Sequence, residues 1–264
     1  MKIPDISLEV TFKNRIPRFK LRTRKKLAKE LGYNSDGLMV WGKSVDFLTD
    51  PRFIEAYELG MGSGHKIMRK SDSSEDIHIE WRVMVALWAA SHARKLEGDF
   101  VECGVNTGIL SLAVCKYIDF NSTGKRFFLF DTYCGVPEHQ IHDKEERQVV
   151  QKVSKYYEEC FGLAKQNFSQ FPQAVLVRGC VPDTLNSEKI DKVCYLSIDM
   201  NIVEPEIAAI EFFWEKLSSG APVILDDYGF KPHRKQKEAF DAFARRTGVE
   251  ILTLPTGQGL LLKP

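Results

Sequence analysis

Short apolar runs alternate with longer stretches of helical periodicity from residue 77 to the end of the chain. The runs have the length of buried strands and are followed by a glycine, a carboxylate or a polar turn. Strands are therefore expected at residues 100–103, 126–131, 174–179, 193–199 and 222–227. Helices are expected at residues 77–96, 109–115, 149–171, 205–217 and 235–247. This alternation predicts an α/β protein with a doubly wound, mostly parallel sheet.

Two short strands are expected at the end of the chain, at residues 249–254 and 260–263, around Gly257 and Gly259. No helix is expected between them, so they should pair as an antiparallel hairpin. With this hairpin the sheet has seven strands.

Residues 1–75 lack the alternation and are expected to form a mainly helical N-terminal extension, or cap, to a domain at residues 76–264. Residues 13–29 carry nine Lys or Arg and no acid, which fits either a solvated basic helix face or a contact with an anionic partner. Asp50-Pro51 predicts the capped start of a helix, and residues 60–64 predict a turn. Exposed apolar positions in this extension would suit a homodimer contact.

The charges balance, with 37 Lys and Arg against 36 Asp and Glu, so nothing draws the whole chain toward nucleic acid or a membrane surface. No signal peptide opens the sequence, and no apolar run approaches the roughly 18 residues that a membrane-spanning helix needs. The six cysteines include no C-x-x-C pair, and several lie in apolar runs, which indicates buried reduced thiols. We therefore expect a cytoplasmic protein that acts on a small molecule.

The segment from Glu102 to Gly108 joins the first strand of this domain to the helix that follows it. Such a junction presents free backbone N–H groups and a positive helix end to a ligand. Gly104 and Gly108 let the backbone approach that ligand closely. A carboxylate at Glu102 does not suit the pyrophosphate of a dinucleotide. The Glu-x-Gly-x-x-x-Gly spacing instead indicates S-adenosylmethionine (SAM), a cationic sulfonium, with Glu102, Gly104, Thr107 and Gly108 as candidate contacts.

Asp131 closes the next strand, about twenty residues past the glycine turn, a spacing that suits a carboxylate binding the two hydroxyls of a ribose. Residues 132–148 show no clear period and are expected to form a long loop, or lid, over the site. We expect specificity for the acceptor to lie in this loop and in residues 1–75.

Two further strands also end in acid, one at Asp199 and the next at Asp226 and Asp227. The carboxyl ends of parallel strands lie on one edge of a sheet, so these carboxylates are expected to meet there. Adjacent carboxylates repel unless a cation or protons lie between them. Hard oxygen ligands favour Mg²⁺ or Ca²⁺, with Mn²⁺ as an alternative, over zinc. The other interpretation is that Asp226 caps a helix and Asp227 faces solvent.

A divalent cation at that edge would orient a substrate with vicinal oxygens and lower the pKa of the hydroxyl to be methylated. The hydroxyl oxygen would then attack the sulfonium methyl group in line, with positioning as the main source of acceleration. These residues predict a metal-dependent SAM O-methyltransferase that acts on a hydroxylated small molecule with vicinal oxygens.

Five motifs stand in order along residues 76–264: Phe100-Val-Glu-Cys-Gly-Val, Phe128-Leu-Phe-Asp-Thr with Gly135-Val-Pro, Asp183-Thr-Leu, Leu196-Ser-Ile-Asp199 and Leu225-Asp-Asp-Tyr228. In these motifs the chain resembles the macrocin O-methyltransferase family, whose members methylate sugar hydroxyls of macrolide and aminocoumarin antibiotics with SAM and Mg²⁺. The resemblance implies a Rossmann-like SAM-dependent methyltransferase fold. It also implies SAM contacts at Glu102, Gly104, Gly108 and Asp131, and metal ligation by Asp199, Asp226 and Asp227, with Asp199 also counted as a cofactor contact.

One position departs from the family pattern. The antibiotic-sugar members have Asp-Gly-Asp where this chain has Asp199-Met-Asn201, and the second aspartate is their proposed general base. Asn201 cannot take a proton, although it could ligate the metal or hydrogen-bond the substrate. Another residue then removes the proton, or the metal alone acidifies the hydroxyl, or the substrate differs. His233 is a candidate base, as are His139 and His142 in the expected loop.

Two other functions stay open on the sequence. An NAD(P)-dependent oxidoreductase would fit the doubly wound pattern, but Glu102 and the single glycine that begins the turn count against it. A non-catalytic SAM-binding protein would keep the fold and lose the base, as Asn201 indicates. The methyltransferase is the leading hypothesis because the glycine turn, Asp131 and the three aspartates support it together.

Overall fold

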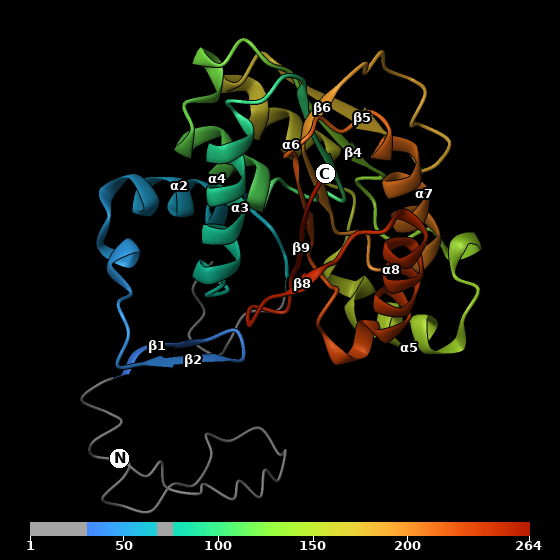
Figure 1. The fold of residues 1–264 in the computed structure, drawn as a ribbon, viewed down its shortest axis with the longest axis horizontal. Helices are drawn as coiled ribbons and strands as arrows, with labels where there is room; N and C mark the ends of the chain where they lie inside the picture. Colours follow the sequence, from blue (N-terminus) through green and yellow to red (C-terminus); the bar gives the residue numbers. More distant parts are fainter. Residues whose placement is uncertain (1–30, 68–75) are drawn as a thin grey trace, which may run out of the picture. The chain divides into compact units, whose positions relative to one another are not determined.

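A computed structural model describes residues 31–67 and 76–264 of the chain (Figure 1). The basic segment at 13–29 lies outside the described residues. The chain divides into two compact units, Met1–Val45 and Asp46–Pro264. The domain boundary expected at residue 75 stays a prediction.

The described part of the first unit is a β-hairpin that the sequence analysis did not predict. Strands β1 (Leu31–Ser35) and β2 (Leu38–Trp41) pair antiparallel, with Ser35 opposite Leu38. The two-residue turn, Asp36-Gly37, has φ values of 50° and 73°. A turn of this kind matches the twist of paired strands and favours Asp-Gly.

The second unit contains a seven-stranded sheet with the order β5-β4-β3-β6-β7-β9-β8. The pairs among the first five strands in this order are parallel, and β9 pairs antiparallel with both β7 and β8. The predicted fold class and C-terminal hairpin are confirmed. The strands are β3 (Asp99–Cys103), β4 (Phe127–Asp131), β5 (Ala174–Arg178), β6 (Val193–Ile198), β7 (Pro222–Leu225), β8 (Leu252–Thr253) and β9 (Gly259–Leu262).

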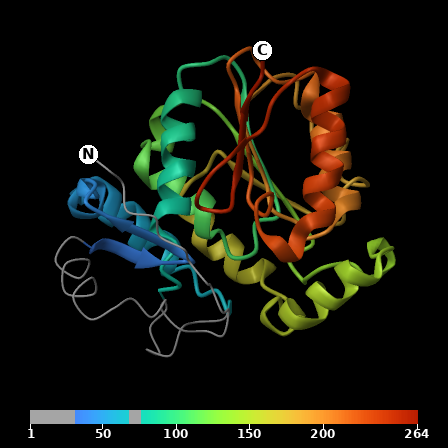
Figure 2. The same ribbon diagram turned by 60° about the horizontal axis from the view of Figure 1, so that its bottom comes forward.

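Helices cover both faces of the sheet, as Figure 2 shows. The α-helices are α2 (Pro51–Met61), α3 (Glu80–Ala93), α4 (Ile109–Tyr117), α5 (Lys144–Val153), α6 (Phe161–Asn167), α7 (Val203–Trp214) and α8 (Arg234–Thr247). The short 3-10 helices are η1 (Asp46–Thr49), η2 (Phe120–Ser122), η3 (Glu138–Gln140), η4 (Ser154–Tyr156), η5 (Phe168–Gln170) and η6 (Lys231–His233). Two hydrophobic clusters separate the layers, one shared with α2, α3, α4 and α6 and the other with α7 and α8.

Alternation along the strands assigns side chains to these two clusters. Phe100 and Tyr195 belong to the cluster under α3 and α4, whereas their neighbours Val101 and Leu196 belong to the cluster under α7 and α8. Successive side chains of a strand point to opposite faces, so fully buried strands are apolar throughout. For this reason the five parallel strands could be predicted from apolar runs in the sequence.

Two helical boundaries differ from the expected ones. The helix expected at 149–171 is broken into α5, η4, α6 and η5, and α5 begins inside the expected loop. Asp143 starts α5, because its side chain accepts hydrogen bonds from the Glu145 and Glu146 N–H groups. Gly60, expected in a turn, lies in α2, where a Cβ would come within 2.4 Å of the Ile109 carbonyl oxygen. The start of α2 is as predicted, with Asp50 as cap and Pro51 first.

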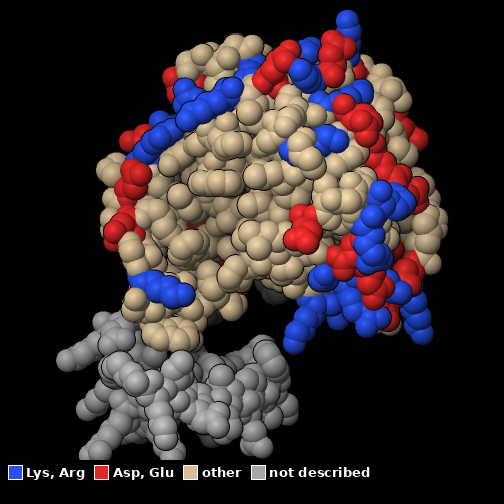
Figure 3. All heavy atoms as spheres, in the orientation of Figure 1, with Lys and Arg blue, Asp and Glu red and all other residues tan. Residues whose placement is uncertain are grey.

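Acidic and basic side chains are interleaved over the α5, α7 and α8 side of the face seen in Figure 3. Ion pairs there include Arg246 with Glu211 and Lys237 with Asp241. This interleaving leaves no broad field of one sign over those helices. Within residues 31–67 and 76–264, no helix combines the length and apolar character needed to cross a bilayer.

The carboxyl ends of β3 and β6 touch through their backbones. Asp199 donates its N–H to the Cys103 carbonyl oxygen at 2.8 Å, and Gly104 follows with φ +91°. A Cβ on Gly104 would lie 1.8 Å from the Asp199 carbonyl oxygen. Only glycine fits this contact, which joins the glycine turn to the first of the three aspartates.

Replacing Gly104 by Ala is expected to lower the free energy of unfolding by more than about 4 kcal/mol, because the two backbones must separate. Gly124→Ala is the matched control, since Gly124 has φ +68° but open space around its Cβ position. Backbone strain alone should cost this control about 1 kcal/mol. Urea denaturation followed by circular dichroism measures both, and equal losses would contradict the steric argument.

Candidate active site

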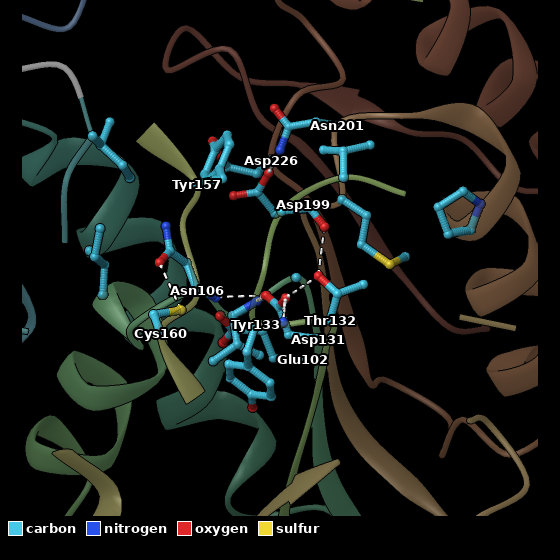
Figure 4. A pocket seen from close by; sticks show the side chains of 18 of the residues that line it. Glu102, Asn106, Asp131, Thr132, Tyr133, Tyr157, Cys160, Asp199, Asn201 and Asp226 are labelled. Carbon is cyan, nitrogen blue, oxygen red and sulfur yellow. Dashed lines mark hydrogen bonds between the residues drawn. The ribbon is translucent and has the colours of Figure 1, made fainter. Parts of the chain in front are cut away.

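A pocket opens where the carboxyl ends of β3, β4, β6 and β7 meet the segment between β4 and α6. Ligands bind at this edge in doubly wound proteins. Figure 4 shows Asp199, Asp226, Asn201 and Tyr157 toward one end of the pocket, and Glu102 and Asp131 toward the other. Of the predicted site residues, the pocket lining includes Glu102, Gly104, Asp131, Asp199, Asn201, Asp226 and Asp227.

Asp131 ties the glycine turn to the end of β4. One carboxylate oxygen, Oδ2, accepts hydrogen bonds from the Val105 and Asn106 N–H groups at 2.6 and 2.7 Å. The other, Oδ1, accepts from the Tyr133 N–H at 2.6 Å and from the Thr132 hydroxyl at 3.3 Å. Four donors therefore surround the carboxylate predicted to bind a ribose, and a diol would have to share or replace them.

Thr107 and Gly108 lie on the side of the turn away from the pocket lining. The Thr107 hydroxyl is 2.8 Å from that of Ser63, and the Thr107 carbonyl accepts from Asn167 at 2.9 Å. A Cβ on Gly108 would lie 2.6 Å from the Phe168 ring. These contacts fix the entry to α4, while the contacts predicted for the two residues with SAM stay predictions.

Glu102 is a buried carboxyl facing the pocket, and it is only 2 % exposed. Burial raises its pKa to about 8, the charges of Asp226 and Asp131 act in the same direction, and the nearby Ser111 hydroxyl opposes them. Its Oε2 has no hydrogen-bond partner. Such a group is favourable beside a cationic ligand, which would stabilise its charged form.

Asp199, Asp226 and Asp227 meet as predicted, each offering an oxygen within 4.8 Å of the others. Burial raises the pKa of Asp199 well above its ordinary value, and the other two aspartates raise it further. Burial, then the charge of Asp226, raises the pKa of Asp227 to about 7. The aspartates lie inside the pocket lining, so the alternative of a helix cap and a solvent-facing side chain is wrong.

The chemistry of this cluster fits a hard divalent cation. Its donors are carboxylate oxygens, and the buried Asp227 Oδ2 has no hydrogen-bond partner. A cation would offset the burial and the like-charge repulsion that together keep the pKa values of Asp199 and Asp227 raised. The three aspartates could hold Mg²⁺, Mn²⁺ or Ca²⁺.

Asn201 lines the pocket next to the cluster, in the left-handed region with φ +65°. Its side-chain amide donates to Asp199 Oδ1 at 3.2 Å. Its backbone N–H and that of Met200 donate to Glu206 Oε1 at 2.9 and 3.0 Å. Glu206 is 2 % exposed, so a buried carboxylate holds the turn that presents Asn201.

None of the candidate histidines lines the pocket. His233 lies behind Asp227, with Nδ1 3.3 Å from Asp227 Oδ2 and 2.8 Å from Gln236 Nε2, and burial lowers its pKa. His139 and His142 are exposed, and His142 pairs with Glu204. The structure thus places His233 beside a predicted metal ligand and outside the pocket lining.

Three pocket-associated residues were missed by the sequence analysis. Tyr157 lines the pocket near Asn201, and burial beside the three aspartates raises its pKa. Arg82 of α3 and Gln258 of the C-terminal hairpin both donate to Asp226. No motif marks these positions, because each comes from an element far in sequence from the strand ends.

Comparison with known proteins agrees with this geometry. Residues 84–252 match the family model described as Macrocin-O-methyltransferase (TylF). No curated protein sequence is a significant match. Among solved structures, the O-methyltransferase NovP has 18% identity and a TM-score of 0.65 over 80% of this chain and 97% of its own.

Two more solved structures share the fold at lower identity. CalS11, a calicheamicin methyltransferase, has 16% identity and a TM-score of 0.51 over 84% of this chain and 98% of its own. An O-methyltransferase from Bacillus cereus, solved with SAH, has 12% identity and a TM-score of 0.50 over 81% of this chain and 91% of its own. At these sequence identities, the similarity to the three solved structures concerns the fold alone.

The raised pKa of Glu102 predicts a pH-dependent affinity for SAM. Below about pH 8 the carboxyl is mostly neutral, so affinity for a cationic ligand should rise up to about tenfold per pH unit and level off above the pKa. Glu102→Gln should bind more weakly at high pH and with a flatter pH profile. Isothermal titration calorimetry measures both proteins, and identical profiles would exclude Glu102 as the titrating contact.

Proposed function

Because the chain belongs to the macrocin O-methyltransferase (TylF) family, whose model matches residues 84–252, we propose that it methylates a hydroxyl of a sugar or another polyhydroxylated small molecule. Family membership makes the chain a SAM-dependent O-methyltransferase, which decides against the oxidoreductase and non-catalytic alternatives. The acceptor and the metal requirement are the proposed parts.

One observation carries the proposal: a single pocket contains a buried carboxyl beside a glycine turn and a cluster of three aspartates. The first arrangement suits the cationic methyl donor, and the second suits a cation that binds vicinal oxygens of an acceptor. Their presence in one pocket lets donor and acceptor meet, which a methyl transfer requires.

We assign the methionine end of SAM to Glu102 and Gly104 and the ribose to the side of Asp131. Thr107 and Gly108 would support this site by fixing the turn from behind. Gly104 brings the glycine turn against the Asp199 backbone, so the donor and the acceptor cluster share one rigid contact. This contact would keep the methyl group and the acceptor oxygen in register.

Asp199, Asp226 and Asp227 would hold a divalent cation. When bound, such an ion lowers the pKa of a ligated hydroxyl and fixes its orientation. Asn201 and Tyr157 lie beside the cluster and would orient the acceptor by hydrogen bonds.

The reaction forms an oxygen–carbon bond and breaks the sulfur–carbon bond, whose electron pair stays on sulfur. The hydroxyl proton leaves the acceptor oxygen, so the products are a methyl ether, S-adenosylhomocysteine and a proton. Asn201 cannot take that proton. His233 would act on Asp227 rather than on the acceptor, because it does not line the pocket.

The metal proposal predicts that Asp227→Asn loses divalent-cation binding and keeps binding of S-adenosylhomocysteine. Wild type should bind Mg²⁺ or Mn²⁺ in calorimetry, and the variant should bind at least about a hundredfold more weakly, because a buried ligand oxygen loses its charge. Methyl transfer from labelled SAM to a panel of hydroxylated glycosides should fall with it.

The control is Asp191→Asn, which removes one negative charge at an exposed position whose partner, Lys189, is 3.7 Å away. This variant should behave as wild type. Wild-type protein that binds no divalent cation would contradict the metal site. Protein that binds no S-adenosylhomocysteine would contradict the assignment of the donor pocket.

A further inference from the structure

Arg82 brings a positive charge into an acidic pocket. It lies near the start of α3, and its guanidinium donates to Asp226 Oδ2 at 2.7 Å. The two side chains are 18 % and 5 % exposed. Among the described residues that line the pocket, Arg82 is the only Lys or Arg, and the same lining contains six carboxyl residues: Glu102, Asp131, Glu158, Asp199, Asp226 and Asp227.

Gln258 occupies the other oxygen of Asp226. Its Nε2 donates to Asp226 Oδ1 at 2.9 Å, and its Oε1 accepts from the Thr256 hydroxyl at 3.0 Å. The amide nitrogen is the end that faces Asp226, because the carboxylate and the nearby Arg82 carbonyl oxygen can only accept hydrogen bonds. Gln258 is fully buried, so water does not compete for these bonds.

The three aspartates therefore differ in their availability to a metal ion. Both oxygens of Asp226 already accept from protein donors, and one donor carries a full charge. Asp227 Oδ2 is buried without a hydrogen bond and has only the His233 ring nitrogen near it, at 3.3 Å, while Asp199 Oδ1 receives a neutral amide at 3.2 Å. Asp227 and Asp199 are the stronger ligands left to a cation, since a charge-assisted bond to Arg82 must be weakened at Asp226.

We propose that Arg82 is an internal counter-cation of the aspartate cluster, which competes with a divalent ion for Asp226 and so lowers the metal affinity of the site. The inference rests on the proposed metal function of the three aspartates. An ion ligated by Asp226 would lie close to the guanidinium, and the repulsion between the two charges is strong in a pocket with little water. Arg82 thus acts through Asp226 as a residue that sets metal affinity.

The opposite role for Arg82 is a scaffold that holds Asp226 in the orientation a metal needs. The two roles differ in sign. Removing a competitor tightens metal binding, whereas removing a scaffold weakens it. A merely structural contribution to folding cannot produce tighter binding.

The test compares Mn²⁺ binding by calorimetry and electron paramagnetic resonance in wild type, Arg82→Gln and Arg82→Lys, without SAM and at the same pH for every protein. Arg82→Gln should bind Mn²⁺ at least about tenfold more tightly, because a unit charge beside the ion is removed. Arg82→Lys keeps the charge without the planar fork and should fall between the two.

The matched control is Arg126→Gln. Arg126 also donates to a carboxylate at 2.7 Å, that of Asp99, but at the opposite end of β3. This variant changes the net charge equally and should bind Mn²⁺ as wild type does. Circular dichroism and S-adenosylhomocysteine binding check that each variant is folded. If Arg82→Gln is not folded, the comparison of Arg82→Lys with wild type tests the proposal.

Unchanged or weaker Mn²⁺ binding in the folded Arg82 variants, with wild-type binding that Asp227→Asn abolishes, would overturn the role of Arg82 and leave the metal site intact. Mn²⁺ binding by none of the proteins would overturn the metal site and this inference together. Tighter binding in Arg126→Gln equal to that in Arg82→Gln would show a general charge effect and also reject the proposal.

Discussion

Buried negative charge at one edge of a parallel sheet is the constraint on which the site depends. The topology delivers Asp131, Asp199, Asp226 and Asp227 to that edge, because each stands at the end of a strand or just beyond it. The carboxylates at this edge differ in what stabilises them.

Asp131 accepts hydrogen bonds from backbone N–H groups of the glycine turn, and Asp226 accepts hydrogen bonds from Arg82 and Gln258. Glu102 and Asp227 each keep an oxygen without a hydrogen bond. A proton or a nearby cation stabilises a buried carboxyl of this kind, and a methyl donor with a sulfonium and a divalent ion are both cations. The two buried carboxyls, Glu102 and Asp227, therefore indicate where cationic ligands bind.

The supports of this edge come from elements that are distant in sequence. Glu206 of α7 holds the turn at Met200 and Asn201, and Glu146 of α5 accepts from the Val203 N–H at the start of α7. The long segment after β4 is thus bonded to the helix that follows the Asp199 turn. A small apolar cluster of Ile141, Val150 and Ile202 lies at the same junction. This part of the pocket wall is held by buried hydrogen bonds and packing, so its shape is set before any acceptor arrives.

The sheet could be predicted from the sequence, because buried parallel strands are apolar throughout and end in recognisable turns. The proximity of Asp199, Asp226 and Asp227 could also be predicted, since the carboxyl ends of parallel strands lie on one edge of the sheet. The sequence did not predict that Arg82, Tyr157 and Gln258 belong to the site. Their positions depend on how a helix, a loop and a hairpin pack against that edge, and no local periodicity carries this information.

The break between α5 and α6 was missed for a related reason. The cap at Asp143 was legible, but the apolar positions on both sides of the break mimic one continuous helix.

Strand β9 lies between β7 and β8 although it is the last strand in the chain. The hairpin tip that precedes β9 supplies Gln258 to Asp226 and closes on the Asp227 turn through the Gly229 N–H and the Gly257 carbonyl oxygen. On a ribosome that makes the chain from its N-terminus, the glycine turn and the first four strands of the sheet are synthesised well before this tip. In a nascent chain, the sheet edge with the glycine turn and the aspartates would therefore lack the hydrogen bond from Gln258 to Asp226. This hydrogen bond can form only after the segment that follows β7 has been made, although Asp226 itself is synthesised some thirty residues earlier.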